Sequence, residues 1–202
     1  MAVDFFCGAG GTTRGLIDAG GYVIAGIDKD IRCEATYVEN NQNGTIDYSA
    51  ARFLQYDIFP QSEEYPQGEK HLEELSNLLE YYEGKALYAP VLFAICAPCQ
   101  PFTRLSKKEL SEKRKQARER DSNLLKEAAG FVARHCPELV LSENVAGISD
   151  PRYGGVWNTF RDDLEALGYV TGSKVVCTSN FGIAQFRKRS ILLAARRELV
   201  RG

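Results

Sequence analysis

The sequence predicts an α/β class: a doubly wound, Rossmann-like fold built on a seven-stranded, mostly parallel sheet with one antiparallel strand. Seven short apolar runs rich in β-branched and aromatic residues predict the strands, and segments with helical periodicity separate most of them. This alternation is typical of βαβ units, in which helices cover both faces of a parallel sheet. At 202 residues and 44% hydrophobic, the chain has enough apolar residues for one core, so residues 1–202 are expected to form a single domain.

The expected strands cover 2–6, 22–27, 53–56, 90–95, 138–142, 169–178 and 190–195, and the expected helices cover 12–19, 32–40, 71–82, 122–136 and 156–167. No helical segment separates the last two strands, which should therefore form the antiparallel pair. In doubly wound sheets, ligands bind beyond the carboxyl ends of the strands. Candidate functional residues are therefore sought directly after each strand.

Two segments fit this alternation poorly. Residues 60–69 are polar, contain two prolines and are expected to form a surface loop. Residues 103–121 are expected to form a solvated helix or a mobile loop, and they contain eight basic residues: Arg104, Lys107, Lys108, Lys113, Arg114, Lys115, Arg118 and Arg120.

Composition limits the possible environments and partners. The net charge is −2 and the pI is about 5.8, so a nucleic-acid partner would need a local basic patch. No run of about 18 apolar residues predicts a membrane span, and Met1 leads directly into a strand, so a cytoplasmic protein is expected. Most of the six cysteines should then be reduced, and with two histidines and one Cys-x-x-Cys pair no metal site is expected.

The first three strands end in residues suited to a nucleotide-like ligand. A glycine-rich turn, Phe6-Cys7-Gly8-Ala9-Gly10-Gly11, follows the first strand and would let the backbone approach a ligand closely, although it could equally be a tight strand-to-helix turn. Asp28 and Asp57 end the next two strands, where they could accept hydrogen bonds from a ribose and an adenine or could cap the following elements. Thr13 replaces a glycine of the dinucleotide fingerprint, which counts against NAD. Together these features favour an adenosine-containing cofactor.

The fourth strand leads into Cys96-Ala97-Pro98-Cys99-Gln100-Pro101, which permits three interpretations. The two cysteines could be a redox pair or half of a zinc site, but the chain offers no second ligand pair. Alternatively, Cys99 is a nucleophile held between two prolines, and Cys96 packs inside the strand. Glu143 follows the fifth strand beside this loop, as a second reactive group or as a helix cap.

Four ordered motifs resemble the cytosine-5 DNA methyltransferase signature: Phe6-x-Gly8-x-Gly10-Gly11, Pro98-Cys99-Gln100, Glu143-Asn144-Val145 and Gln185-x-Arg187-x-Arg189. The resemblance runs from Asp4 to about Ala195. It implies an S-adenosylmethionine-dependent methyltransferase fold and methyl transfer to carbon 5 of cytosine in DNA through a covalent cysteine adduct, with S-adenosylhomocysteine as the product. The DNA partner would be a duplex with its target cytosine flipped out of the helix.

The resemblance also implies roles for individual residues. The catalytic group comprises Cys99, Glu143, Arg187 and Arg189. The cofactor group comprises Phe6, Gly8, Gly10, Gly11, Asp28, Lys29, Asp57, Ile58, Pro98 and Leu124. The nucleic-acid group comprises Gln100, Arg104, Lys107, Lys108 and Gln185. Lys29 departs from the family, which commonly has an apolar or aromatic residue at this position, although its aliphatic stem can still pack on adenine.

Other interpretations of the family resemblance stay open. Pro98-Cys99-Gln100-Pro101-Phe102-Thr103-Arg104 resembles the branch of the family that acts on tRNA. The family's target-recognition domain and terminal cofactor segment have no counterpart here, so the chain is expected to methylate poorly unless a second polypeptide supplies them. It could also be a truncated, non-catalytic relative. A bacterial enzyme of this kind would associate with the nucleoid and serve restriction and modification.

Overall fold

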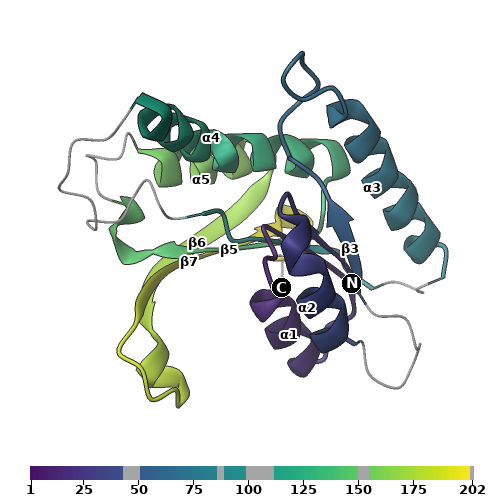
Figure 1. Ribbon diagram of the computed structural model, residues 1–202. Coiled ribbons are helices and arrows are strands. Elements are labelled where there is room, and N and C mark those ends of the chain that lie inside the picture. Colours follow the sequence, from purple (N-terminus) through teal and green to yellow (C-terminus); the bar gives the residue numbers. More distant parts are fainter. Residues whose placement is uncertain (43–50, 86–88, 99–111, 150–154, 201–202) are drawn as a thin grey trace.

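The computed structural model describes residues 1–42, 51–85, 89–98, 112–149 and 155–200 (Figure 1). Its strands are β1 (Ala2–Phe5), β2 (Val23–Asp28), β3 (Arg52–Gln55), β4 (Leu92–Ile95), β5 (Leu139–Val145), β6 (Tyr169–Cys177) and β7 (Lys188–Arg196). Its α-helices are α1 (Gly11–Asp18), α2 (Glu34–Asn40), α3 (Gly68–Glu83), α4 (Glu112–His135) and α5 (Val156–Ala166). The seven predicted strands and five predicted helices are confirmed, with shifted ends.

The strands form one sheet in the order β3-β2-β1-β4-β5-β7-β6. All neighbours are parallel except β7, which runs antiparallel to both β5 and β6, so the prediction of one reversed strand is confirmed. From β1 the chain proceeds outward through β2 and β3 and then returns to place β4 on the other side of β1. The sheet therefore has its topological switch point between β1 and β4, where ligands bind in doubly wound folds.

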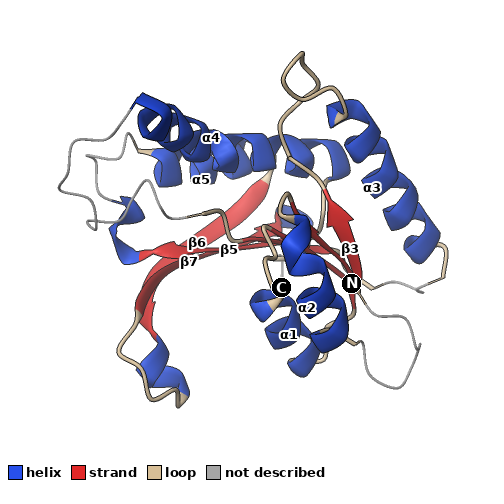
Figure 2. Ribbon diagram, viewed as in Figure 1, coloured by secondary structure: helices blue, strands red, loops and turns tan. Residues whose placement is uncertain are grey.

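Helices cover both faces of the sheet (Figures 1 and 2). Helices α1 and α2 lie on one face, where Tyr37 packs with Val23 and Cys7. On the other face, Leu75 of α3, Phe131 of α4 and Phe160 of α5 join one large core cluster with the strands. This three-layer arrangement confirms the predicted fold class.

Helix α4 differs from its prediction because it begins at Glu112, ten residues before the expected start. Residues 112–121 are therefore helical and not a loop. They consist mainly of Glu, Lys, Arg, Gln and Ala, which have favourable helix propensities, but they lack an apolar stripe. Amphipathic periodicity does not predict this extension, because its sequence contains no apolar stripe.

Beyond the core, the hairpin formed by β6 and β7 projects away from the rest of the molecule (Figure 1). Its strands pair continuously from Tyr169↔Arg196 to Cys177↔Lys188. A short 3-10 helix, η5 (Thr178–Phe181), follows β6 in the connection between the strands. Among the described residues, no helix has the length and apolar character needed to cross a membrane.

Candidate active site

The glycine-rich turn connects β1 to α1 through backbone conformations that favour glycine. Gly8 and Gly10 have φ angles of 51° and 90°, and Phe6 has a φ of 60°. The Gly8 amide donates a 2.9 Å hydrogen bond to the Asp28 carboxylate at the end of β2. The turn is thus fixed to the neighbouring strand at the switch point.

Gly10 is required by packing beneath the turn as well as by its positive φ. A Cβ at Gly10 would lie 2.1 Å from Nδ2 of Asn41 and 2.9 Å from the ring of Tyr37, both far below a normal contact. The Asn41 amide also donates to the Ala9 carbonyl, at 3.4 Å. The α2 region therefore supports the turn from the side of the α1 and α2 layer.

A fully buried carboxylate, Asp4, anchors the start of α1. Its Oδ2 accepts hydrogen bonds from the Thr13 hydroxyl at 2.7 Å and from the Thr13 amide at 3.0 Å. The Thr13 hydroxyl also lies 3.1 Å from the Tyr37 hydroxyl. Burial raises the pKa of Asp4 to about 7, because the charged form loses solvation. Sequence reasoning missed this network, although a polar Asp within an apolar strand was its available signal.

A cavity of about 200 Å³ lies at the carboxyl ends of β1 to β4. It is lined by Phe6, Ile27, Asp28, Lys29, Tyr56, Asp57, Ile58, Cys96, Pro98 and Leu124. The structure thereby brings together seven of the ten cofactor candidates named from the sequence. The other three are Gly8, Gly10 and Gly11, which form the adjoining turn and are not among the described residues that line the cavity.

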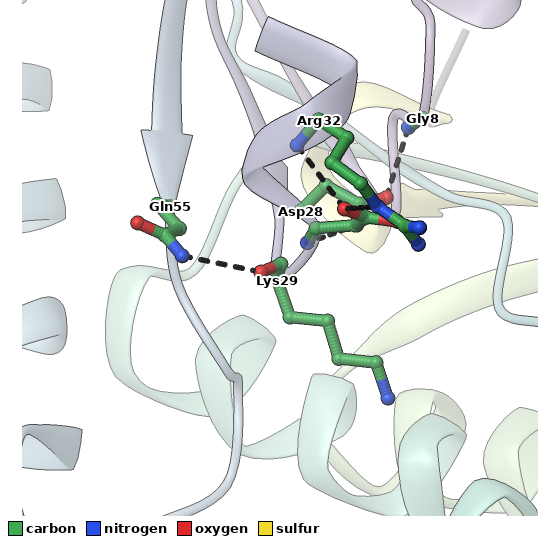
Figure 3. A network of polar contacts seen from close by, with 6 residues as sticks. Gly8, Asp28, Lys29, Arg32 and Gln55 are labelled. Atoms are coloured by element: carbon green, nitrogen blue, oxygen red, sulfur yellow. Dashed lines mark hydrogen bonds and ion pairs between the residues drawn. The ribbon is translucent and has the colours of Figure 1, made fainter.

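Asp28 presents its carboxylate at the rim of this cavity, and backbone donors fix its orientation (Figure 3). Its Oδ1 accepts the Asp30 amide at 2.9 Å, while its Oδ2 accepts Gly8. The nearby Arg32 pairs with Asp30 at 2.6 Å, which lowers the pKa of Asp30 to about 2. The Lys29 side chain extends away from Asp28 (Figure 3), and its carbonyl accepts the Gln55 amide at 3.4 Å.

Three cavity residues were absent from the sequence-based cofactor group: Ile27, Tyr56 and Cys96. Tyr56 stacks on His71 with a 4.3 Å centroid separation and donates a 2.7 Å hydrogen bond to Glu74. Tyr56 directly follows the end of β3 and precedes Asp57, and this position in the sequence could have identified it as a cavity residue.

The expectation that Cys96 packs inside a strand is wrong. Strand β4 ends at Ile95, and Cys96 lies beyond it in the cavity wall. The Thr12 hydroxyl lies 3.7 Å from the Cys96 sulfur, and burial raises the pKa of this thiol to about 12. Cys96 is therefore a protonated wall residue rather than an activated nucleophile.

Glu143 of β5 forms a 2.6 Å ion pair with the guanidinium of Arg189 in β7. The antiparallel register places Arg189 opposite Val145, one diagonal position from Glu143 on the same sheet face. Arg187 and Gln185 lie exposed before β7, and no described contact joins Arg187 to Glu143. The structure thus pairs one of the two candidate arginines with the carboxylate.

Two buried polar side chains join β5 to the last residue of β4 and to the segment that follows it. The Ser142 hydroxyl donates to the Ile95 carbonyl at 2.7 Å, and the Asn144 amide donates to the Ala97 carbonyl at 3.0 Å. These residues flank Glu143 and point to the opposite face of the strand. They fix the backbone of Glu143 relative to Ala97, two residues before Cys99.

Five candidates named from the sequence lie outside the described residues: Cys99, Gln100, Arg104, Lys107 and Lys108. Pro98, which lines the cavity, is the last described residue before them. In the described ranges, no group of three or more His, Cys, Asp or Glu side chains is arranged to hold a metal ion.

Comparison with known proteins identifies relatives of the chain. It is 33% identical over 98% of its length to the Type II methylase M.HgiDII of Herpetosiphon aurantiacus, of which it covers 48%. It is 25% identical over 95% of its length to the Type II methyltransferase M.NaeI of Lentzea aerocolonigenes, of which it covers 39%. The chain therefore spans half or less of the length of these curated relatives.

Solved structures share the fold. The Schizosaccharomyces pombe Dnmt2 methyltransferase superimposes with a TM-score of 0.64 at 18% identity, covering 96% of this chain and 49% of that one. The sequence profile of C-5 cytosine-specific DNA methylases matches residues 69–201, which is more than half of the chain. The profile match and the site geometry agree: the chain belongs to the C-5 cytosine-specific DNA methylase family.

Proposed function

We propose that this chain carries the catalytic part of an enzyme that methylates carbon 5 of cytosine in DNA, with Cys99 as the nucleophile. The observation that carries the proposal is the Glu143–Arg189 ion pair, whose strand is hydrogen-bonded to the backbone leading into Cys99. A carboxyl group on a strand tied to Ala97, two residues before a cysteine in the sequence, suits the activation of a pyrimidine ring.

The cavity fits S-adenosylmethionine in the chemistry of its lining. Asp28 and Asp57 offer carboxylate acceptors for ribose hydroxyls and an adenine amino group, and Ile27, Ile58 and Leu124 offer apolar contacts. Gly8, with no atom within 4 Å of its Cβ position, leaves the turn open to close approach by the ligand. When bound, S-adenosylmethionine supplies the methyl group and leaves as S-adenosylhomocysteine.

The protein's own groups would act on the cytosine ring. The Cys99 thiolate adds to carbon 6, forming a carbon–sulfur bond and moving an electron pair toward carbon 5, which then takes the methyl group. Glu143, as a protonated carboxyl group, donates a hydrogen bond to ring nitrogen 3 and accepts one from the exocyclic amine, stabilising the displaced charge. Loss of the carbon 5 proton to a base then restores the ring double bond and expels the Cys99 thiolate.

Arg189 holds Glu143 in the orientation that this role requires. A guanidinium is planar and permanently charged, so it can pair with the carboxylate while keeping one carboxylate edge toward the base. Ser142 and Asn144 fix the strand on both sides of Glu143. We propose that these three residues act by positioning rather than by contact with the reacting atoms.

DNA is favoured over tRNA as the substrate. The family description names DNA, and the curated relatives are named Type II methylases. Flipping of the target cytosine would cost a few kcal/mol and would deliver carbon 6 to Cys99.

Trapping tests the proposal. A duplex containing 5-fluorocytosine should form a denaturation-resistant adduct with the protein in the presence of S-adenosylmethionine, because fluorine cannot leave as the carbon 5 proton does. Cys99→Ser should abolish the adduct, whereas Cys136→Ser, which changes an exposed cysteine far from the cavity, should retain it. An adduct that survives Cys99→Ser would overturn the proposal.

Two further arms extend the assay. A tRNA containing 5-fluorocytosine, offered in parallel, should not form the adduct. An adduct with tRNA and not with DNA would assign the chain to the branch of the family that acts on tRNA. A second polypeptide that covers the other half of the relatives should increase the rate of adduct formation, since the chain spans about half of their length. No adduct in either mixture would count against catalysis.

A further inference from the structure

The tip of the β6–β7 hairpin carries three exposed apolar side chains that the proposed chemistry does not use. Phe181 is 69% exposed, Ile183 54% and Phe186 79%. These three residues are called the apolar tip. Figure 1 shows that this end of the hairpin projects away from the body of the molecule, so the described part of the chain does not cover it.

The tip is ordered by its own hydrogen bonds. The Thr178 amide donates to the Arg187 carbonyl at 3.0 Å, and the Thr178 hydroxyl donates to the Gln185 carbonyl at 2.6 Å. Gly182, with a φ of 81°, ends the short helix η5 and turns the chain back toward β7. Because the tip is already held in shape, a ligand would bind it with little further ordering cost.

The surroundings of the apolar tip are cationic. Arg187 and Lys188 directly follow Phe186 and are exposed, and neither forms an ion pair among the described residues, although the whole chain has a net charge of −2. The Lys188 ammonium lies 5.5 Å from the centre of the Phe186 ring. An exposed aromatic ring beside two exposed basic side chains is typical of surfaces that bind nucleic-acid bases and phosphates together.

The position of the tip relates it to the candidate active site. Arg189 pairs with Glu143 near the turn end of the same hairpin, and Arg187 is exposed between this pair and Phe186. A duplex whose cytosine reaches Glu143 would therefore have its neighbouring phosphates beside Arg187 and Lys188. Removal of a base from the stack exposes the faces of its neighbours, and some DNA-binding proteins insert apolar side chains between unstacked base steps.

We propose that the apolar tip stacks against unstacked bases of the DNA duplex next to the target cytosine, with Phe186 as the principal contact. The proposal rests on the proposed function, since it takes DNA as the substrate and Glu143 as the destination of the flipped base. It adds a base-contacting surface to the phosphate contacts of the arginines. The positive charge favours DNA as the occupant over an apolar protein surface, which would leave the basic side chains unpaired.

Fluorescence anisotropy of labelled duplexes tests this contact. One duplex carries an abasic site that mimics the gap, with 2-aminopurine beside it, and the other is intact. Phe186→Ala should weaken binding to the gapped duplex on the order of tenfold, the effect expected for one lost stacking contact. The slope of log affinity against log salt should not change, because no phosphate contact is removed.

Matched variants separate stacking from loss of structure. Phe186→Trp should restore binding and the quenching of 2-aminopurine. Val175→Ala removes an apolar side chain of 49% exposure from the same hairpin, away from the tip, and should behave as wild type. Circular dichroism should match for all three variants, since Phe186 makes few internal contacts.

The proposal is overturned if Phe186→Ala binds the gapped duplex as wild type does, or if its effect equals that of Val175→Ala. Loss of affinity accompanied by a smaller salt slope would also overturn it, because that result assigns the effect to Arg187 and Lys188. Failure of 5-fluorocytosine trapping with normal Phe186-dependent binding would reject the proposed chemistry alone. Normal trapping by Phe186→Ala with unchanged affinity would reject the apolar tip alone.

Discussion

The cofactor side and the substrate side of the site are stabilised in different ways. On the cofactor side, Asp4 and Thr13 are fully buried, and their hydrogen bonds join β1 to α1 beneath the glycine turn. On the substrate side, Arg189 and Glu143 retain 17% and 35% exposure, and Phe186 retains 79%. The cofactor cavity is thus preformed by interactions within the protein, whereas the substrate surface keeps polar and aromatic groups available to a ligand.

Because of this difference, substitutions on the cofactor side should affect folding, and substitutions on the substrate side should affect DNA binding and chemistry. Changes beneath the glycine turn should reduce stability and cofactor affinity together, because the same hydrogen bonds support both. Changes around Glu143 should affect DNA chemistry more than folding.

The pH dependence of stability should reveal the burial of Asp4. Because its folded pKa is about 7 and its ordinary value is 3.8, the folded state holds a proton that the unfolded state releases between these values. Stability contributed by Asp4 is therefore complete below about pH 4 and is lost as the pH rises to about 7. Relative to Asp4→Asn, the wild type should lose up to about 4 kcal/mol over this range.

Urea unfolding of both proteins from pH 4 to pH 8 measures this difference. Asp4→Asn is the suitable reference because its carbonyl can still accept both bonds from Thr13. Parallel curves for the two proteins would show that Asp4 titrates normally, and the contrast between the two sides of the site would lose its main support.

Asp4→Ala should cost about 2 to 3 kcal/mol at pH 5, since it leaves the Thr13 amide without its buried acceptor. Affinity for S-adenosylmethionine should fall at the same time, because the glycine turn is no longer anchored. Calorimetric titration and urea unfolding of the same preparation check both effects. Loss of stability with unchanged affinity would separate the buried network from the cavity.

Asn144→Asp should destabilise the protein by about 2 kcal/mol, because the carboxylate can still accept from the Val145 amide but can no longer donate to the Ala97 carbonyl. Adduct formation with 5-fluorocytosine DNA should slow by about tenfold or more, while affinity for S-adenosylmethionine stays near the wild-type value. Rapid trapping by this variant would mean that Ala97 needs no tether from β5.

The Glu143–Arg189 pair should contribute the smallest amount to folding, about 1 kcal/mol in a double-mutant cycle with Glu143→Gln and Arg189→Gln. Its contribution to the rate of adduct formation should be larger. Arg189→Lys keeps the positive charge but lacks the planar guanidinium, so it should restore only part of that rate relative to Arg189→Gln. Urea unfolding and adduct rates of the four proteins measure both quantities. A coupling of several kcal/mol in stability would place this pair with the buried side of the site.

The sequence was sufficient to predict the seven strands, the five helices and the single reversed strand, because apolar runs and helical periodicity alternate along the chain. It also identified Asp28, Asp57 and Leu124, which the fold brings into one cavity from three separate elements. It did not identify the Asp4–Thr13–Tyr37 network, because a hydrogen bond between buried groups leaves no periodic signal. For the same reason, Ser142 and Asn144 were seen only as neighbours of Glu143.

Cys96 and the start of α4 show two further limits of prediction. Strand β4 ends at Ile95, where the predicted strand also ends, but Cys96 lies one residue beyond it, in the cavity wall and not in the core. The first turns of α4 are stabilised by propensity without an apolar face, so a search for buried stripes could not find them. The position of Cys96 and the first residue of α4 were both mispredicted, because the alternation of apolar and polar side chains fixes neither of them.

The packing of Tyr37 has a consequence for any attempt to redesign the chain. A Cβ at Gly26 would lie 2.4 Å from the Tyr37 ring, and a Cβ at Gly10 would lie 2.9 Å from it, so one ring occupies the volume of two absent side chains. Enlarging Gly26 would require a smaller residue at 37, which would also remove the hydroxyl beside Thr13, and enlarging Gly10 would require Asn41 to move as well. Tyr37 therefore limits the side-chain size that positions 10 and 26 can accept. Helix α2, which carries Tyr37, contributes in this way to the shape of the glycine turn.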